Sequence, residues 1–344
     1  MPLKQTVVTA LALLLLLFLL PLLLLGGSQT DPDSAALPTG SLPLDRTVVS
    51  PPAQTAADEQ VSVRVALGDG EILTLPLDKY LWRVVAAEMP ASFEPQALRA
   101  QAAAARTYTL SKMGRTVENH PDADVCTDIT CCQAYIDPES AAANWGDQAE
   151  AYTGKITAAV SDTDGMVIRY NGQLIQALFH SSSAGQTVDA VEVWGNDVPY
   201  LVSVESPEGE EVPNWHSTAV FTPEEFSALF LAEYPGADLS GDPSGWFTNP
   251  VRDDAGVVET MDVGGITVRG TALRSLLDLR SACFFVTAGA DGITFSVTGY
   301  GHGVGMSQYG ANALAREGKS WEEILQWYYT GVTIEAMDPA DYAG

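Results

Sequence analysis

Basic residues are scarce in this sequence of 344 residues, which has 17 Lys and Arg against 44 Asp and Glu and a formal net charge of -27. The basic residues do not cluster anywhere along the chain. Because phosphate backbones are bound by clustered Lys and Arg, these features exclude a nucleic-acid partner. An acidic surface of this kind favours solubility and says little about the fold.

Cysteine is also rare, with four residues in the chain. This number is too small for a disulfide-dense scaffold. Three of the four, Cys126, Cys131 and Cys132, lie close together, and clustering of this kind indicates a shared role.

One long apolar run is present, at the N-terminus. Residues 6–25 are almost wholly apolar, and a helix needs about 20 such residues to span a bilayer. Lys4 precedes the run, and no Lys or Arg follows it before Arg46. The positive-inside rule therefore predicts a single-pass anchor over residues 1–26, with a cytoplasmic N-terminus and the body outside the cell membrane. The alternative is a cleaved signal peptide, whose apolar core is usually about 7–15 residues long.

The segment after this run has little apolar content. Residues 27–60 are rich in Pro, Ser, Thr, Ala and Asp, which predicts a flexible linker. We expect one large folded domain over residues 61–332 and a short C-terminal tail over residues 333–344.

Helical and strand patterns alternate irregularly in the body of the chain. No regular βαβ repeat and no internal repeat is present, so we expect an α+β fold in which helices pack on a mixed sheet. Asp78 is expected to cap the first helix, and Pro95 to lie in the first turn of the second. Strands are expected over residues 61–66, 72–75, 158–170, 173–180, 265–269, 283–287 and 292–297, and helices over 78–88, 95–113, 222–233, 308–316 and 321–329.

Glu88 is the first candidate for chemistry. Four apolar residues precede it, and Met89 and Pro90 follow it. Apolar surroundings desolvate a carboxyl group and raise its pKa, so the acid form can donate a proton near neutral pH. The alternative is an ordinary helix-end glutamate that is exposed to water or paired with an arginine.

Two arginines are candidates for binding. Arg99 and Arg106 are seven residues apart on the second expected helix and so share one face. Their guanidinium groups could bind a carboxylate or a sugar, although two ordinary surface arginines would show the same spacing.

A histidine precedes the cysteine cluster. His120, Cys126, Cys131 and Cys132 follow the spacing His-x5-Cys-x4-Cys-Cys, which offers four ligands of the types that tetrahedral zinc prefers. The alternative is disulfide bonding, which an oxidising compartment permits and in which Cys283 could take part. The spacing leaves both possibilities open.

Two stretches, residues 179–185 and 300–310, are rich in Gly and Ser and each contains a histidine. Glycines let a backbone approach a ligand closely, and the His and Ser side chains can hydrogen-bond to hydroxyl groups. A His/Ser pair could also indicate a hydrolase triad, but the sequence lacks the Gly-x-Ser-x-Gly motif of a nucleophile elbow.

Taken together, these stretches resemble the stage II sporulation protein D family, whose domain is also called SpoIID/LytB. The matching blocks span most of residues 61–332 in one order, and an anchor followed by a Pro-rich spacer also fits the family layout. The blocks are residues 80–90, 97–108, 126–135, 179–185, 194 with 199–201, 270–275, 301–315 and 324–329.

The resemblance implies a role for individual residues. Glu88 takes the place of the catalytic acid/base, and His120, Cys126 and Cys132 that of a structural zinc site. Cys131 stands where many members have histidine, and exchange of these two ligands is chemically reasonable. Further side chains in or beside the matching blocks are expected to bind substrate: Arg99, Arg106, Tyr108, His180, Ser181, Ser182, Tyr200, His302, Ser307 and Gln308.

The activity that the resemblance implies is that of a peptidoglycan lytic transglycosylase in the engulfment stage of sporulation. Such an enzyme cleaves stem-peptide-free glycan after N-acetylmuramic acid and leaves a 1,6-anhydro sugar. Its expected partners are glycan strands, the membrane, a wall amidase or endopeptidase and other engulfment membrane proteins. The alternative is a non-catalytic peptidoglycan-binding or amidase-activating module, as some LytB-type relatives are described.

Overall fold

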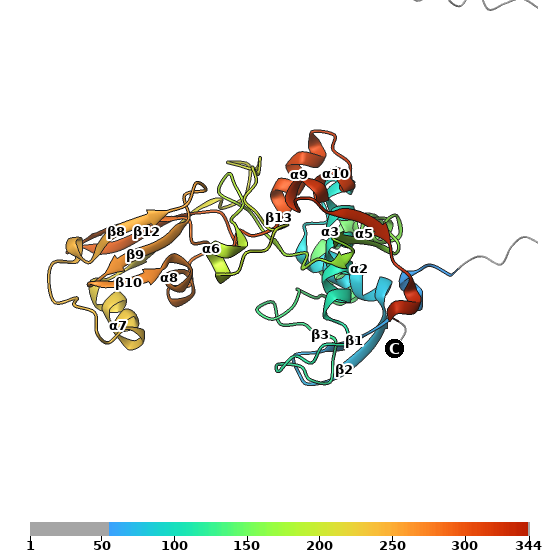
Figure 1. Ribbon diagram of the computed structural model, residues 1–344, viewed down its shortest axis with the longest axis horizontal. Helices are drawn as coiled ribbons and strands as arrows, with labels where there is room; N and C mark the ends of the chain where they lie inside the picture. The colour runs from blue at the N-terminus through green and yellow to red at the C-terminus, as the bar shows by residue number, and fades with distance from the viewer. Residues whose placement is uncertain (1–54, 343–344) are drawn as a thin grey trace, which may run out of the picture. The chain divides into compact units, whose positions relative to one another are not determined.

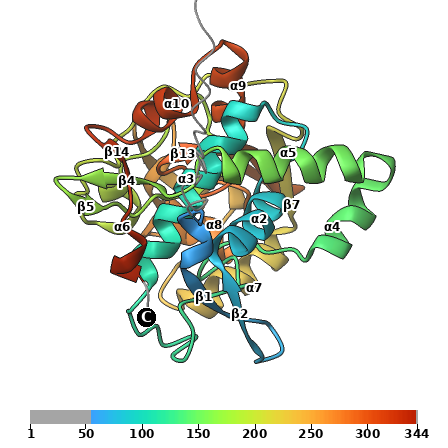
Figure 2. The ribbon, with the colours of Figure 1, turned by 90° about the vertical axis from the view of Figure 1, so that its right-hand side faces the viewer.

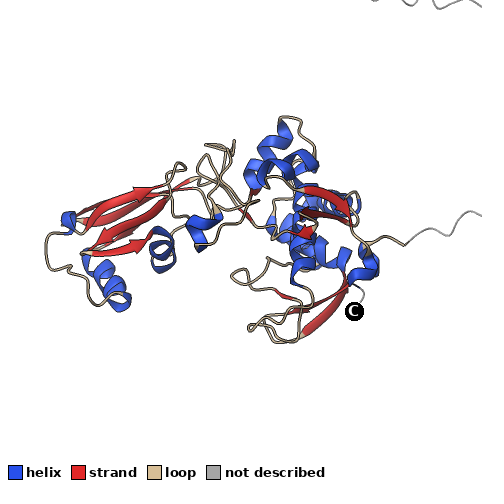
Figure 3. Cartoon of the chain, viewed as in Figure 1, coloured by secondary structure: helices blue, strands red, loops and turns tan. Residues whose placement is uncertain are grey.

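The computed structural model describes residues 55–342, and they form an α+β fold as expected (Figures 1 and 3). The predicted anchor and nearly all of the predicted linker lie outside the described residues. Within residues 55–342, no helix has both the length and the apolar character needed to cross a membrane.

The described chain begins with a short 3-10 helix, η1 (Asp58–Gln60), and the predicted hairpin of β1 (Ser62–Ala66) and β2 (Ile72–Pro76). The linker therefore ends before residue 60, because Asp58 is fully buried. Helix α2 (Leu77–Glu88) follows directly. Asp78 lies in its first turn and does not cap it, since Pro76 occupies the N-cap position.

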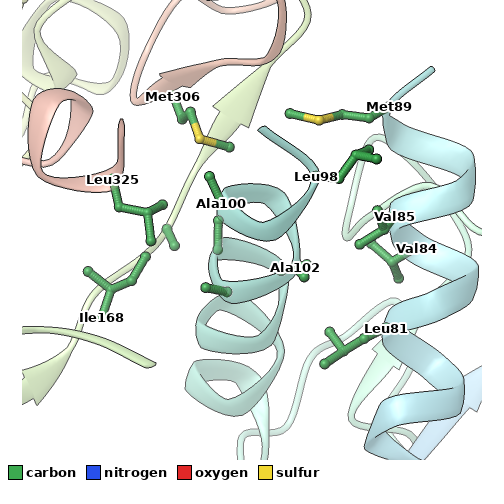
Figure 4. Packing of buried hydrophobic residues seen from close by; sticks show 14 of the residues in the cluster. Leu81, Val84, Val85, Met89, Leu98, Ala100, Ala102, Ile168, Met306 and Leu325 are labelled. Carbon is green, nitrogen blue, oxygen red and sulfur yellow. The ribbon is translucent and has the colours of Figure 1, made fainter. Parts of the chain in front are cut away.

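Helix α3 (Pro95–Lys112) lies at the centre of a first hydrophobic core, where it packs against α2, α5 (Ala149–Ser161), α9 (Gln308–Arg316) and α10 (Trp321–Tyr328) (Figure 2). Its alanines let neighbours approach from every side. Figure 4 shows Ala100 and Ala102 between α2 and the side chains of Ile168 and Leu325. Pro95 opens the helix, as predicted.

The strand predicted over residues 158–170 is partly wrong. Helix α5 continues to Ser161, and only Met166–Tyr170 forms a strand, β4. Ile156, Ala159 and Val160 are the buried residues of α5, and their spacing is helical. Three short elements complete this region: α4 (Pro138–Trp145), the 3-10 helix η2 (Gly146–Gln148) and β5 (Gln173–Leu174).

Residues 333–344 are not simply a tail. β14 (Thr333–Ala336) pairs antiparallel with β4, and the 3-10 helix η4 (Pro339–Tyr342) follows it. Met337 is buried against the first core. The last strand within residues 55–342 thus belongs to the sheet β14-β4-β5.

Two very short parallel pairings join distant parts of the chain. β3 (Val125–Cys126) pairs with β1 and fixes the start of the cysteine loop. β6 (Phe179–His180) pairs with β13 (Met306–Ser307), which brings the two Gly/Ser-rich stretches together. The rest of the strand predicted over residues 173–180 lies between β5 and β6 and is irregular.

A second hydrophobic core lies around Phe226, Phe230, Trp246, Phe284 and Phe295. The single mixed sheet expected from the sequence is wrong, because the strands of the described chain form five small sheets. The second core takes two of them, β10-β9-β8 and β11-β12-β7. Its elements are β7 (His216–Phe221), α7 (Pro223–Glu233), η3 (Pro243–Gly245), β8 (Phe247–Arg252), β9 (Val258–Val263), β10 (Ile266–Arg269), α8 (Gly270–Leu276), β11 (Phe284–Gly289) and β12 (Gly292–Thr298), with α6 (Ala190–Trp194) earlier in the chain.

Candidate active site

Glu88 is the last residue of α2 and is half-buried. The backbone N–H of Ala134 donates to its Oε1 at 2.7 Å, and the Nε2 amide of Gln308 donates to its Oε2 at 3.2 Å. Burial raises the pKa of the Glu88 carboxyl, and these two hydrogen bonds oppose the rise only in part. The carboxyl is therefore both oriented and biased toward its acid form.

Glu88 lines a pocket of about 510 Å³, a size typical of small-molecule sites. Segments that lie far apart in the sequence form its wall. Among the described residues that line it, Glu88 is the only carboxylate. Of the predicted binding residues, Tyr108, His180, Ser181, His302 and Gln308 share this pocket with Glu88.

The pairing of β6 with β13 places both histidines of the Gly/Ser-rich stretches at this wall. His180 Nδ1 lies 3.2 Å from the carbonyl oxygen of Val304, so Nδ1 carries the proton and Nε2 accepts from the Ser183 hydroxyl at 2.7 Å. Burial lowers the pKa of His180 to about 3 and that of His302 to about 4. Both imidazoles are therefore neutral at pH 7.

Glycine is required at two positions in or beside the wall of this pocket. Gly301 has φ +118, and a Cβ atom there would lie 2.7 Å from the Cβ of His180. Gly310, in the first turn of α9, is packed so tightly that a Cβ atom would meet the Tyr328 hydroxyl at 2.1 Å. The glycines thus let the two Gly/Ser-rich stretches pack directly against each other and against α10.

A buried glutamate that the sequence analysis left without a role holds these stretches in place. Glu208 accepts a hydrogen bond from the Ser183 N–H at 2.6 Å and from the hydroxyls of Ser206 and Ser307. Ser307 is fully buried and is the N-cap of α9, so it supports the fold and does not contact the pocket. The signal that could have identified Glu208 is an acidic residue in a turn-rich segment with serines around it.

Two more of the predicted binding residues, Ser182 and Tyr200, do not line the pocket of Glu88. Ser182 lines an adjoining pocket. The Tyr200 hydroxyl accepts a hydrogen bond from the Gln176 N–H at 3.0 Å, and its ring packs against Tyr170, away from Glu88.

The prediction that Arg99 and Arg106 present a binding face is wrong. Arg106 is 0% exposed and forms a bidentate ion pair with Asp58, with Nη2–Oδ2 at 2.6 Å and Nε–Oδ1 at 2.8 Å. Arg99 pairs with Asp162 at 2.5 Å. Neither arginine lines the pocket of Glu88, because α3 is covered on the side where Arg106 projects.

The pocket also contains residues that the sequence analysis did not select. Trp194 closes α6, Arg274 belongs to α8, and Tyr300 lies between β12 and β13. All three fall in or beside the blocks that carry the family resemblance, which was the available signal. Ala134 contributes through its backbone N–H, which no side-chain pattern can reveal.

The predicted ligands His120, Cys126, Cys131 and Cys132 do come together. Their ligand atoms all lie within 4.8 Å of one another, and all four cysteines of the chain are free thiols. The disulfide alternative is therefore not what the structure contains. The cluster could hold a metal ion.

Two of the distances between ligand atoms in this cluster are close to those around a tetrahedral metal. His120 Nε2 lies 3.4 Å from Cys132 Sγ, and the Sγ atoms of Cys131 and Cys132 are 3.9 Å apart. Ligands around a tetrahedral zinc are about 3.6–3.8 Å apart. His120 Nδ1 is hydrogen-bonded to the carbonyl oxygen of Ala123 at 3.1 Å, which leaves Nε2 free to bind a metal.

The geometry therefore defines one oriented, desolvated carboxyl in a pocket beside a possible metal site. Comparison with known proteins shows which proteins the chain resembles. A family profile described as "SpoIID: Stage II sporulation protein" matches residues 68–170. The chain is 35% identical over 342 residues to Stage II sporulation protein D of Bacillus subtilis (strain 168), covering 97% of each chain.

Two further relatives extend the comparison. Stage II sporulation protein D of Bacillus amyloliquefaciens is 36% identical over 286 residues, which are 83% of this chain and 81% of the relative. The amidase enhancer of Bacillus subtilis (strain 168) is 30% identical over 299 residues, which are 73% of this chain but 39% of that protein. The chain belongs to the stage II sporulation protein D family.

Proposed function

We propose that this protein is a peptidoglycan lytic transglycosylase that cleaves glycan strands after N-acetylmuramic acid, with Glu88 as its acid/base. The observation that carries the proposal is the single, desolvated carboxyl in the pocket. Hydrolytic glycosidases flank the scissile bond with two carboxyl groups. A sugar that attacks its own anomeric carbon needs neither an enzyme nucleophile nor a base-activated water. Membership of the sporulation family and similarity to an amidase enhancer support a role at the cell wall.

The mechanism uses one carboxyl group first as an acid and then as a base. Glu88, in its acid form, protonates the glycosidic oxygen while the bond from this oxygen to the anomeric carbon breaks. The 6-hydroxyl of the same muramic acid attacks that carbon, and its proton passes to the Glu88 carboxylate. The products are a 1,6-anhydro sugar end and a new 4-hydroxyl, and Glu88 is again protonated.

The partners of Glu88 suit both halves of this cycle. The N–H of Ala134 and the amide of Gln308 fix the plane of the carboxyl and stabilise the anion that forms after proton donation. The neutral imidazoles of His180 and His302 add no positive charge that would lower the pKa of Glu88. Burial of the Glu88 carboxyl strengthens these hydrogen bonds, because the local dielectric is lower than in water.

The direct test uses Glu88→Gln and Glu88→Ala with purified peptidoglycan from which stem peptides have been removed. The wild-type protein should release fragments with 1,6-anhydromuramic ends, and both variants should release none while remaining folded. Glu317→Gln is the matched control, because Glu317 is exposed at the end of α9. Wild-type release from either Glu88 variant would refute the assignment.

A second function is favoured by one comparison. The similarity to the amidase enhancer supports a module that stimulates a wall amidase without cleaving glycan itself. Adding an amidase to the same assay separates the two functions. A transglycosylase produces anhydro ends when acting alone on stripped glycan, whereas an activator only raises the rate of peptide release by the amidase.

We also assign Zn²⁺ to the cluster of His120, Cys126, Cys131 and Cys132, as a structural ion. Zinc would cross-link this loop, and the four protein ligands leave no open position for a substrate or water. The loop continues directly to Ala134, whose N–H binds Glu88. The His and Cys ligands would therefore affect Glu88 indirectly, by fixing the loop that positions the Ala134 N–H.

The proposed location follows from the sequence. We place residues 1–26 in the cell membrane with the N-terminus in the cytoplasm, so that the catalytic body faces the wall. A coil over residues 27–54 would give the body a reach of roughly 30 Å. A wall amidase or endopeptidase that strips stem peptides, and other membrane proteins of engulfment, are the partners that this place and reaction require.

A further inference from the structure

A second pocket adjoins the one that holds Glu88. Its volume is about 430 Å³, and Trp194, Arg274, Gly301 and His302 line both pockets. The two pockets therefore lie side by side and share these four residues as a common wall. No carboxylate from the described residues lines the second pocket. It does contain polar groups whose bonding capacity the chain itself leaves unused.

Arg274 is the charged group where the pockets meet. It is half-buried, and its Nε donates to the carbonyl oxygen of Arg280 at 3.3 Å. Among the described residues it forms no ion pair, although the chain has 44 acidic residues. An unpaired cation that has lost part of its hydration is costly unless an anion joins it. The outer nitrogens of its guanidinium are thus available to a planar anion.

Ser182 supplies a second unused group. The residue is 3% exposed, lines the second pocket, and its buried Oγ has no hydrogen-bond partner. Its backbone is fixed by an antiparallel bridge to Tyr300, with N–O distances of 3.0 and 2.8 Å. A buried hydroxyl without a partner is expensive in the free protein, so a ligand that bonds to it gains affinity.

Trp194 provides an apolar platform beside both groups. Trp194 is 46% exposed, and the centroid of its ring lies 5.6 Å from the centroid of the His302 ring. An exposed indole at the rim of a groove, next to hydrogen-bonding groups, can stack against the apolar face of a sugar ring. A ligand that suits all three groups is a sugar with a carboxylate: the cation can bind the carboxylate, the hydroxyl can hydrogen-bond to the sugar, and the indole can stack against its ring.

We propose that the second pocket is a subsite for a carboxylate-bearing sugar next to the bond that Glu88 cleaves. Arg274 binds the carboxylate through two N–H donors, and the Ser182 hydroxyl hydrogen-bonds to the same sugar. The identity of this sugar as muramic acid rests on the proposed function. Its carboxylate is either the free lactyl group or the end of an attached stem peptide, and the experiment separates these sources.

The test measures binding without turnover. Calorimetry on the Glu88→Gln protein uses three muramic-acid tetrasaccharides: one with free lactyl carboxylates, one with these groups amidated, and one with stem peptides attached. Arg274→Gln should weaken binding of the free-carboxylate form about ten- to hundredfold and leave the amidated form unchanged. If Arg274→Gln weakens binding of the peptide-bearing form only, the subsite is supported and the carboxylate that it binds is that of the peptide.

Two further variants exclude a purely structural effect. Arg269→Gln removes the same charge from an exposed position that lines neither pocket and should keep full affinity. Ser182→Ala should keep or raise the melting temperature and weaken binding about two- to tenfold, because its hydroxyl has no partner to lose.

Equal affinity of wild type and Arg274→Gln for every carboxylate form, or an equal loss for all three ligands, overturns the proposal. These results do not depend on cleavage, so a failure of the transglycosylase assay would leave them intact.

Discussion

The pKa and the orientation of the Glu88 carboxyl are set by neighbours from the end of α2, the cysteine loop and α9. Its apolar surroundings disfavour the charged form, while the hydrogen bonds from Ala134 and Gln308 keep the carboxyl in one orientation. Replacing either neighbour would change the position of the carboxyl as well as its pKa. Desolvation of the Glu88 carboxyl therefore lowers the folding stability wherever the carboxyl is ionised.

This cost has a measurable dependence on pH. The pKa of Glu88 is higher in the folded chain than in the unfolded chain, so its contribution to stability is fully present below the unfolded pKa. The contribution is lost as pH rises through the folded pKa. Glu88→Gln should therefore match the wild-type melting temperature at about pH 4 and exceed it at about pH 8.

Thermal unfolding of both proteins across this range checks the prediction. A difference that is constant with pH would mean that the carboxyl is not desolvated. The rate of glycan cleavage should fall over the same rise in pH, because the acid form of Glu88 is lost.

Arg106 is a structural residue, and its variants should show this. Arg106→Ala leaves the fully buried Asp58 carboxylate without its partner, which typically costs about 3–5 kcal/mol of unfolding free energy. Chemical denaturation measures the loss. Arg99→Ala is the matched control, because the partly exposed pair with Asp162 should contribute only about 0–1 kcal/mol. Comparable effects of the two substitutions would contradict the burial of Arg106.

At the scale of elements, the cysteine loop links a possible metal site to the Glu88 carboxyl. The loop leaves β3 at Cys126, passes Cys131 and Cys132, and reaches Ala134 within the same turn-rich segment. The Tyr108 hydroxyl donates to the carbonyl oxygen of Cys131 at 3.2 Å, which ties the loop to α3. A cross-link among the side chains of this loop would therefore fix one of the two partners of Glu88.

Removing the metal should loosen this loop first. Chelation, or Cys126→Ser, should release about one zinc ion per chain and increase hydrogen exchange over residues 126–134 while α3 remains protected. Elemental analysis and exchange mass spectrometry measure the two effects. Cys283→Ser is the matched control, since Cys283 is buried but lies outside the cluster. A protein isolated without metal, or a loop whose exchange does not respond, would reject the assignment of zinc.

At the scale of the whole molecule, the sequence predicted best where a pattern is local. The hairpin of β1 and β2, helices α2, α3, α7, α9 and α10, and the His/Cys cluster all follow from residues close together in the chain. The capping boxes at Thr222 and Ser320 show why two of these helices begin where they do. Gln308 was expected in the pocket and lies there, but as a partner of Glu88.

The sequence-based predictions were wrong or incomplete where tertiary contacts determine the position and exposure of a side chain. Helix spacing placed Arg99 and Arg106 on one face but could not show that the rest of the protein covers Arg106, whose partner Asp58 lies in a segment with the composition of a linker. Strands β7 and β8 expose many side chains, so their apolar signal is weak. Glu208 and Ala134 act through buried hydrogen bonds between distant segments, which leave no periodic pattern.

The parallel pairing of β6 with β13 has a consequence for protein synthesis, because β13 lies late in the sequence and is made long after Glu88. Residues 77–134, which include Glu88 and the N–H of Ala134, leave the ribosome well before Gln308 and β13, and the chain is made from its N-terminus. A nascent chain therefore carries the carboxyl but neither its second hydrogen-bond partner nor the wall that desolvates it. The surroundings of Glu88 therefore cannot assemble until the chain has been made as far as Gln308, so the proposed cleavage of glycan could begin only after that point in synthesis.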